Sequence, residues 1–437
     1  MTSPQPVPKA STALSDDTGE HHHTRERLYE ADKVRAFPLT TSSESGAATD
    51  LPSDLRSQMS GDFSLFDQLR DRHIDSVDSN GATLPVRAEI YVMALGEIPG
   101  VGHATAVKLY DGRDFASLFV ANRDEVHWIA GNAGITTPHA FTEAFLEHRD
   151  NALASAHEEL SRFQSIGIEL ILDKDPRYPA RLRDLSDRPR WLFVRGNLEL
   201  LSSDRLITVV GTREPTPAGV SLASRVASVL VERGFALVSG LAEGIDAIVH
   251  KEVVDRKSQT VAVLGTGIFN DFPAQTAYLR TPILQNGGTL ITEFFPKEQY
   301  SRQRFIQRNR IQAALSEITI PVEAKVPSGT LHTIRFARQY NRMVLGVKWA
   351  GAEETSLHEF LRESHDQIVE VPQSDDPFLD AVGTKYNYLD FARQSQVFRR
   401  NSQIERVVKF TRSVIRSEQL QPFEVERMIK AIRAEDP

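Results

Sequence analysis

Runs of aliphatic and β-branched residues recur through the middle of the chain, each followed by a polar turn and a stretch with helical spacing. The first two runs, 206–210 and 235–238, lead directly into glycine-containing turns at Gly211 and Gly240. Short, continuously apolar runs are typical of strands that are buried on both faces of a parallel sheet. Similar runs follow at 261–264, 289–292, 318–322 and 343–347. The alternation predicts an α/β fold whose core is a Rossmann-like, doubly wound parallel sheet with helices on both faces.

The same pattern divides the chain into four parts. Residues 1–60 are polar, rich in Ser, Thr, Pro and Asp, and without sustained periodicity, which predicts a disordered segment. Residues 84–163 have helical spacing and predict a small helical domain. The α/β core is expected over 164–372, and amphipathic helices are expected in the tail, 376–437, whose role the pattern leaves open.

A short turn in the helical part carries the first candidate for DNA contact. Ile98-Pro99-Gly100-Val101-Gly102 separates two helical stretches, an arrangement that resembles SAM or helix–hairpin–helix domains. There the glycine N–H groups and the N-terminus of the second helix can hold a DNA phosphate without reading bases. A tight turn between two packed helices explains the same residues, and the sequence leaves both interpretations open.

Composition narrows the class of protein. No apolar run approaches the ~20 residues of a membrane span, and the N-terminus lacks a signal-peptide layout. The absence of cysteine excludes disulfides and thiolate metal sites, so we expect a cytoplasmic protein that does not bind membranes.

The formal net charge is −8, but residues 205–350 hold 18 Lys and Arg against 11 Asp and Glu, a net of +7. The other residues hold 33 against 48, a net of −15. A basic centre in an acidic chain is typical of a polyanion site.

Three loops at the carboxyl ends of predicted strands suit a phosphate, because their residues are small and helix N-termini follow them. They lack G-x-G-x-x-G and G-x-x-x-x-G-K-[ST], so the fingerprints of dinucleotide-binding dehydrogenases and P-loop NTPases are missing. The candidate phosphate contacts in these loops are Gly211, Thr212, Arg213, Ser239, Gly240, Gly244, Lys325, Ser328, Gly329 and Thr330. We expect Asp246, His250 and Glu323 to orient the loops. No nucleophile or metal-ligand set accompanies Asp246 and His250, so we expect no catalytic residue, cofactor or metal.

The segment 301–310 places four arginines around one aromatic residue. Guanidinium groups beside an aromatic ring suit single-stranded nucleic acid, since charge follows the phosphates and the ring stacks on a base. The alternative is that the aromatic side chain belongs to the core and the arginines are solvated or paired with nearby acids. The candidate contacts are Arg304, Phe305, Arg308, Asn309 and Arg310.

Over roughly 168–350 the chain resembles the DNA-processing protein A (DprA/Smf) family. The resemblance rests on Val210-Gly211-Thr212-Arg213, Ser239-Gly240-Leu241-Ala242-x-Gly244-Ile245-Asp246 and Phe305-x-x-Arg308-Asn309-Arg310, in that order. It implies a non-enzymatic protein, commonly a homodimer, that binds single-stranded DNA. Such a protein protects incoming DNA and loads a RecA-type recombinase in natural transformation and recombination. It also implies that Arg308 and Arg310 lie near phosphates and Phe305 against a base.

One departure from the family keeps two other functions open. Glu243 stands where the family usually has an arginine, and a carboxylate there would repel a phosphate. The chain could instead be a nucleotide-sensing module on the same fold. A nucleotide phosphoribohydrolase of the LOG type is the other alternative. That group needs P-G-G-x-G-T-x-x-E, and 322–330 lacks the glycine pair and the following glutamate.

Overall fold

The computed structural model describes residues 76–77, 83–84, 87–110 and 115–371. The segments 1–60 and 376–437, for which we predicted disorder and a helical tail, lie outside the described residues.

Helices form the first part of the described chain, where helical spacing predicted them. They follow a two-residue ladder of β1 (Ser76–Val77) with β2 (Thr83–Leu84). Side chains of the first and last helices are buried together with Phe193 of the sheet, so these helices pack on the sheet. The helices are α4 (Ala88–Glu97), α5 (His103–Tyr110), α6 (Phe115–Val120), α7 (Arg123–Asn132) and α8 (Pro138–Ser165).

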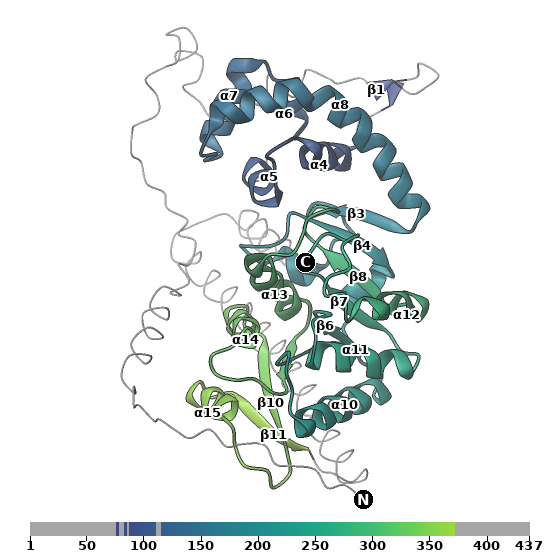
Figure 1. Cartoon of the computed structure of the whole chain (residues 1–437), viewed down its shortest axis with the longest axis vertical. Coiled ribbons are helices and arrows are strands. Elements are labelled where there is room, and N and C mark those ends of the chain that lie inside the picture. Colours follow the sequence, from purple (N-terminus) through teal and green to yellow (C-terminus); the bar gives the residue numbers. More distant parts are fainter. Residues whose placement is uncertain (1–75, 78–82, 85–86, 111–114, 372–437) are drawn as a thin grey trace, which may run out of the picture. The chain divides into compact units, whose positions relative to one another are not determined.

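A nine-stranded sheet forms the core, in the order β11-β10-β9-β5-β6-β7-β8-β4-β3 (Figure 1). Every pair from β11 to β8 is parallel, and β4 runs antiparallel to both of its neighbours. The strands are β3 (Ile168–Leu172), β4 (Trp191–Gly196), β5 (Leu206–Val210), β6 (Ala236–Ser239), β7 (Thr260–Val263), β8 (Thr289–Thr292), β9 (Ile318–Pro321), β10 (Met343–Trp349) and β11 (Gln367–Val371).

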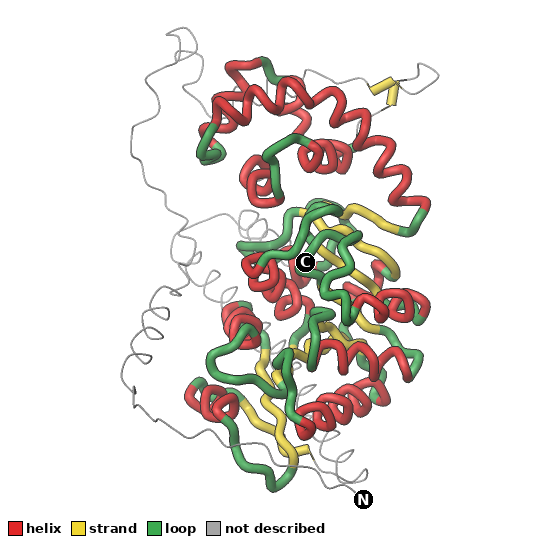
Figure 2. The backbone as a smooth tube through the Cα atoms, viewed as in Figure 1, coloured by secondary structure: helices red, strands yellow, loops and turns green. Residues whose placement is uncertain are grey.

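Helices cover both faces of the parallel part of this sheet (Figure 2). One apolar cluster joins α10 and α11 to β5, β6 and β9–β11, and two others join α13, α14 and α15 to the sheet. The doubly wound α/β fold predicted from the apolar runs is therefore confirmed. The remaining helices are α9 (Ala180–Arg183), η2 (Leu198–Ser202), α10 (Pro217–Glu232), α11 (Ile245–Asp255), η3 (Ala277–Leu279), α12 (Arg280–Gln285), α13 (Arg302–Leu315), α14 (Thr330–Gln339) and α15 (Ser356–Glu363). In the described part of the chain, no helix combines the length and apolarity that a membrane span requires.

The strand order creates a switch point beside β5. The chain proceeds from β5 to β6, β7 and β8 on one side, and β9, β10 and β11 lie on the other. Loops that leave the carboxyl ends of β5 and β9 therefore turn in opposite directions, which is where open α/β sheets bind ligands. The two loops touch here, since the Thr212 N–H donates to the Glu323 carbonyl oxygen over 2.7 Å.

Candidate nucleic-acid interface

Three neighbouring strands, β5, β6 and β7, are followed at once or after one residue by Gly211, Gly240 and Gly265. A Cβ on Gly211 would come within 2.5 Å of Ile245, and one on Gly265 within 2.5 Å of the Phe305 ring. A Cβ on Gly240 would overlap the Arg308 guanidinium. We expected small residues here to let a ligand approach, but the structure uses these glycines to let side chains of α11 and α13 reach the strand ends.

Asp246, at the start of α11, orders the loop after β6. Its Oδ2 accepts a hydrogen bond from the Gly240 N–H over 3.1 Å. Burial raises the pKa of this carboxyl, while the charge of Arg308 and a hydrogen bond from Ser239 act in the opposite direction. The loop is joined to its neighbour by Ile245, whose N–H donates to the Thr212 carbonyl oxygen over 3.1 Å. These contacts are those expected of a loop-orienting carboxylate.

Glu323 connects the loop after β9 to the start of α10. Its carboxylate accepts from the Thr216 N–H over 3.1 Å and from the Thr216 hydroxyl over 3.0 Å. Thr216 in turn caps α10, because its hydroxyl oxygen accepts from the Gly219 N–H. The Glu323 carboxylate therefore lies beside the N-terminus of α10. Because the Thr216 N–H already donates to this carboxylate, it does not bind a phosphate.

His250 braces α11 against the sheet instead of forming a pair with Asp246. Its Nδ1 lies 2.9 Å from the Thr260 hydroxyl oxygen, and that hydroxyl donates to the Leu237 carbonyl. The ring is fully buried, and the backbone of Ser239 also lies within hydrogen-bonding reach of it. Burial lowers the pKa of His250 to about 3, so the ring is neutral at physiological pH.

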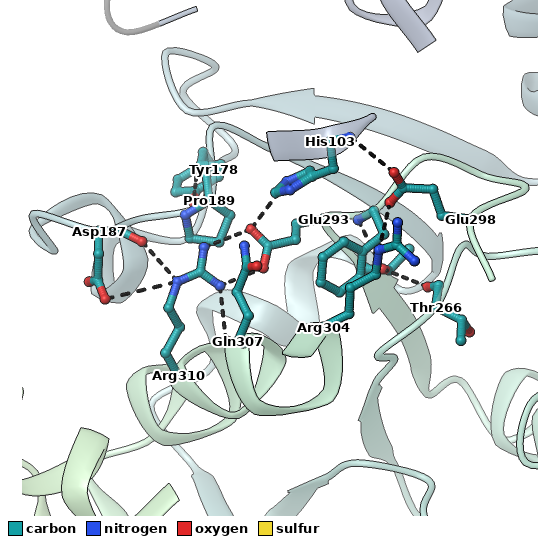
Figure 3. A network of polar contacts seen from close by, with 12 residues as sticks. His103, Tyr178, Asp187, Pro189, Thr266, Glu293, Glu298, Arg304, Gln307 and Arg310 are labelled. Carbon is teal, nitrogen blue, oxygen red and sulfur yellow. Dashed lines mark hydrogen bonds and ion pairs between the residues drawn. The ribbon is translucent and has the colours of Figure 1, made fainter. Parts of the chain in front are cut away.

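Arg310 does not face the loops, which corrects the expectation that it contacts phosphate. Its guanidinium forms a two-pronged ion pair with Glu293, with contacts of 2.5 Å and 2.6 Å (Figure 3). Glu293 is only 1% exposed, and His103 Nε2 lies 3.4 Å from it. Burial by itself would raise the pKa of Glu293, but Arg310 and His103 outweigh it and hold the value at about 2. Arg310 is therefore paired with a nearby acid, which is what the alternative interpretation of 301–310 predicted.

Phe305 and Arg308 are also buried, at 5% and 3% exposure. We expected both side chains to be open to a ligand, and their burial corrects that expectation. Arg308 donates to the Val263 carbonyl over 2.7 Å, and its guanidinium lies 5.0 Å from the centre of the Phe305 ring. Burial lowers the pKa of Arg308 to about 10. The negative charge of Asp246 raises this pKa, and the positive charge of Arg213 lowers it further. Together Phe305 and Arg308 form the floor of the site.

Arg213 lies above that floor and is exposed. Its guanidinium is 5.5 Å from the centre of the Phe305 ring, and that of Arg308 is 5.0 Å from it, so Arg213, Phe305 and Arg308 converge on one place. Neither Glu214 nor Asp246 pairs with it, and within the described ranges no carboxylate does.

The third loop supplies further polar groups at the same end of the sheet. Lys325 is exposed and forms no ion pair within the described residues, and the Ser328 hydroxyl oxygen is buried without a hydrogen-bond partner there. Asn309 donates to the Gly329 carbonyl over 3.4 Å, which ties α13 to this loop. Gly329 and Thr330 begin α14.

Arg304 and the glycine turn of the helical part are both engaged with Glu298 (Figure 3). Arg304 Nε lies 3.4 Å from Glu298, and its Nη1 donates to the Gln299 carbonyl over 2.8 Å. The His103 N–H, at the start of α5, donates to Glu298 Oε1 over 2.9 Å. A carboxylate of the core thus takes the place that a DNA phosphate would occupy in a helix–hairpin–helix, which favours the packed-turn interpretation.

Comparison of the chain with known proteins shows the family to which it belongs. The family model for DNA recombination-mediator protein A matches residues 169–370. The DNA processing protein DprA of Streptococcus pneumoniae is 34% identical over 219 residues, which are 50% of this chain and 74% of that protein. The chain belongs to the DNA-processing protein A family.

Other members of the family show how far the similarity extends. DprA of Bacillus subtilis is 33% identical over 188 residues, 43% of this chain and 63% of that protein. The X-ray structure of DNA processing protein A from Streptococcus pneumoniae superposes with a TM-score of 0.51 at 28% identity, covering 64% of this chain and 94% of that one. Across these curated DprA and Smf relatives, the chain spans from 52% to 74% of their length.

Two features of the site had no clear signal in the sequence. Glu298 was not anticipated because nothing local relates it to His103, which lies 195 residues away. Tyr300 directly precedes Ser301, the N-cap of α13, and therefore lies outside the helix in which Phe305 is buried; this position is the signal that could have distinguished the two aromatic residues.

Proposed function

We propose that this chain binds single-stranded DNA, without altering it, along the loops at the carboxyl ends of β5 and β9. The exposed cations of the site are Arg213 on the first loop and Lys325 on the third, with the Ser328-Gly329-Thr330 turn beside Lys325. The strand would lie over the floor formed by Phe305 and Arg308.

The observation that carries this proposal is the guanidinium of Arg213 above Phe305, which forms no ion pair within the described residues. Arg213 and Arg308 both face this ring, and the charge of Arg213 helps to lower the pKa of Arg308. Asp246, the carboxylate that offsets Arg308, is itself buried and already accepts a hydrogen bond from the Gly240 N–H. A phosphate beside Arg213 would relieve the repulsion between the two guanidinium groups, and it would be screened less than at an open surface.

Glu243 constrains the path of the strand. It is half-buried on the loop after β6 and pairs with no cation in the described ranges. A carboxylate there repels phosphate, so we place the strand along the first and third loops, away from Glu243.

Fluorescence anisotropy with labelled oligo-dT tests the proposal. Arg213→Ala should weaken binding about tenfold, the size expected for losing a hydrogen bond to a charged group, and should lower the salt slope by about 0.7. Arg335→Ala is the matched control, because Arg335 is exposed on α14 and outside the loops. Affinity that is the same in both variants and in the parent chain would refute the site.

A competition experiment and a hydrolysis assay separate the other two functions. A mononucleotide that displaces oligo-dT at equal phosphate concentration would favour a nucleotide-sensing module. Release of free base from nucleoside monophosphates would favour the phosphoribohydrolase over a binding protein.

We further propose that the protein acts as a homodimer that hands the strand to a RecA-type recombinase, in natural transformation and recombination. The membership in a family of DNA-processing and recombination-mediator proteins supports this role. Light scattering of the full chain and a recombinase-loading assay on a coated single strand test the two parts separately.

A further inference from the structure

Two aromatic rings form a surface beside the site. Tyr300 is 42% exposed, and its ring centre lies 4.4 Å from that of the half-buried Phe272, with the planes tilted by 32°. Both rings rest on Phe305, whose centre is 5.1 Å from Tyr300 and 5.7 Å from Phe272. Single exposed aromatics are ordinary, but a pair supported by a buried third ring is a contiguous apolar patch.

The segments that carry these two rings are held in place by hydrogen bonds. The Asn270 side chain donates to the Gln299 side chain over 2.7 Å, which joins the loop of Phe272 to the segment of Tyr300. Arg280 donates to the Ile268 carbonyl over 2.9 Å, and the Thr276 hydroxyl donates to the Leu241 carbonyl over 2.6 Å. A surface that is already ordered loses little conformational entropy when a ligand binds to it.

The patch adjoins the proposed phosphate contact. Phe305 is shared, because the Arg213 guanidinium lies 5.5 Å and the Tyr300 ring 5.1 Å from its centre. An exposed cation and an exposed ring on one support are the two elements that bind single strands, the first by charge and the second by stacking. Phe305 itself cannot supply that ring, since it is 5% exposed and covered by its neighbours.

We propose that Tyr300, supported by Phe272, is the surface on which a base of the bound single strand stacks, while Arg213 holds a nearby phosphate. This inference rests on the proposed function and adds the residue that recognises the base. Every base has an aromatic face, so the contact would be tolerant of sequence but would require a base to be present.

The test compares two ligands of equal charge, labelled dT20 and an abasic deoxyribose-phosphate strand of the same length. Tyr300→Ala should weaken binding to dT20 by roughly 5- to 20-fold, the lower part of the range for one base–aromatic stack, because the ring is only partly exposed. It should leave binding to the abasic strand unchanged, and Tyr300→Phe, which keeps the ring, should bind dT20 like the parent. Tyr278→Ala is the control, since Tyr278 is 60% exposed and does not contact Phe305.

The outcomes separate this inference from the function on which it rests. If the parent chain binds neither ligand, the proposed function fails. If the parent binds dT20 but Tyr300→Ala binds it equally well, or weakens both ligands alike, base stacking on Tyr300 is wrong while DNA binding stands. Thermal unfolding of each variant checks that the fold is kept.

Discussion

Replacing Arg310 by methionine tests whether its guanidinium stabilises the fold or binds a phosphate of the DNA. The guanidinium is buried against Glu293, whose pKa is held at about 2 instead of the ordinary 4.5. Converted at 1.36 kcal/mol per pKa unit, this difference corresponds to about 3 kcal/mol of stability at pH 7. A carboxyl whose pKa is lowered by folding contributes this stability above its ordinary pKa and loses it as the pH falls toward 2. Removing the cation would leave a buried carboxylate without compensation, which typically costs about 3–5 kcal/mol.

Urea unfolding at pH 7 measures the effect. Arg310→Met should lose about 3 kcal/mol, and adding Glu293→Gln should restore part of it, because the uncompensated charge is then gone. Arg213→Met is the matched control. Its guanidinium is exposed and makes no ion pair in the described ranges, so its change should stay within about 0.5 kcal/mol. An Arg310→Met variant that keeps its stability and yet loses DNA affinity would refute the buried-pair argument and restore Arg310 as a phosphate contact.

Two further predictions concern the elements that support the loops. His250→Gln should flatten the pH dependence of stability below pH 6.5, because folding keeps His250 neutral down to about pH 3 while the unfolded chain takes up a proton. In the parent this coupling makes the protein about 2 kcal/mol less stable at pH 5 than at pH 8, and unfolding curves at the two pH values show whether His250→Gln removes that difference. Gly240→Ala should cost about 1–3 kcal/mol and weaken binding of oligo-dT, because its Cβ would overlap the Arg308 guanidinium; calorimetry showing an unchanged melting temperature would contradict this.

The pattern of apolar residues by itself determined the α/β core. The run at 289–292 matches β8 at both ends, and that at 206–210 matches β5, because a strand buried on both faces is built mainly from aliphatic and β-branched residues along its whole length. Ile311, Ala314 and Leu315 of α13 are fully buried, because they lie on the side of the helix that packs against the sheet. The place of Arg213 at the edge of the sheet also followed from the sequence, because it lies on the loop that leaves the carboxyl end of β5.

Only the tertiary structure decided which charged and aromatic side chains face outward. Arg213 and Arg310 have the same side chain, but Arg310 pairs in the interior with Glu293, which also lies beside the distant His103, whereas Arg213 is exposed over the Phe305 ring. The N-terminus of α5 offers the donors of a phosphate site, yet Glu298, 195 residues away, supplies the anion. Burial of a charge depends on whether a partner of opposite sign reaches it across the fold, and a local pattern of residue types carries no information about such distant partners.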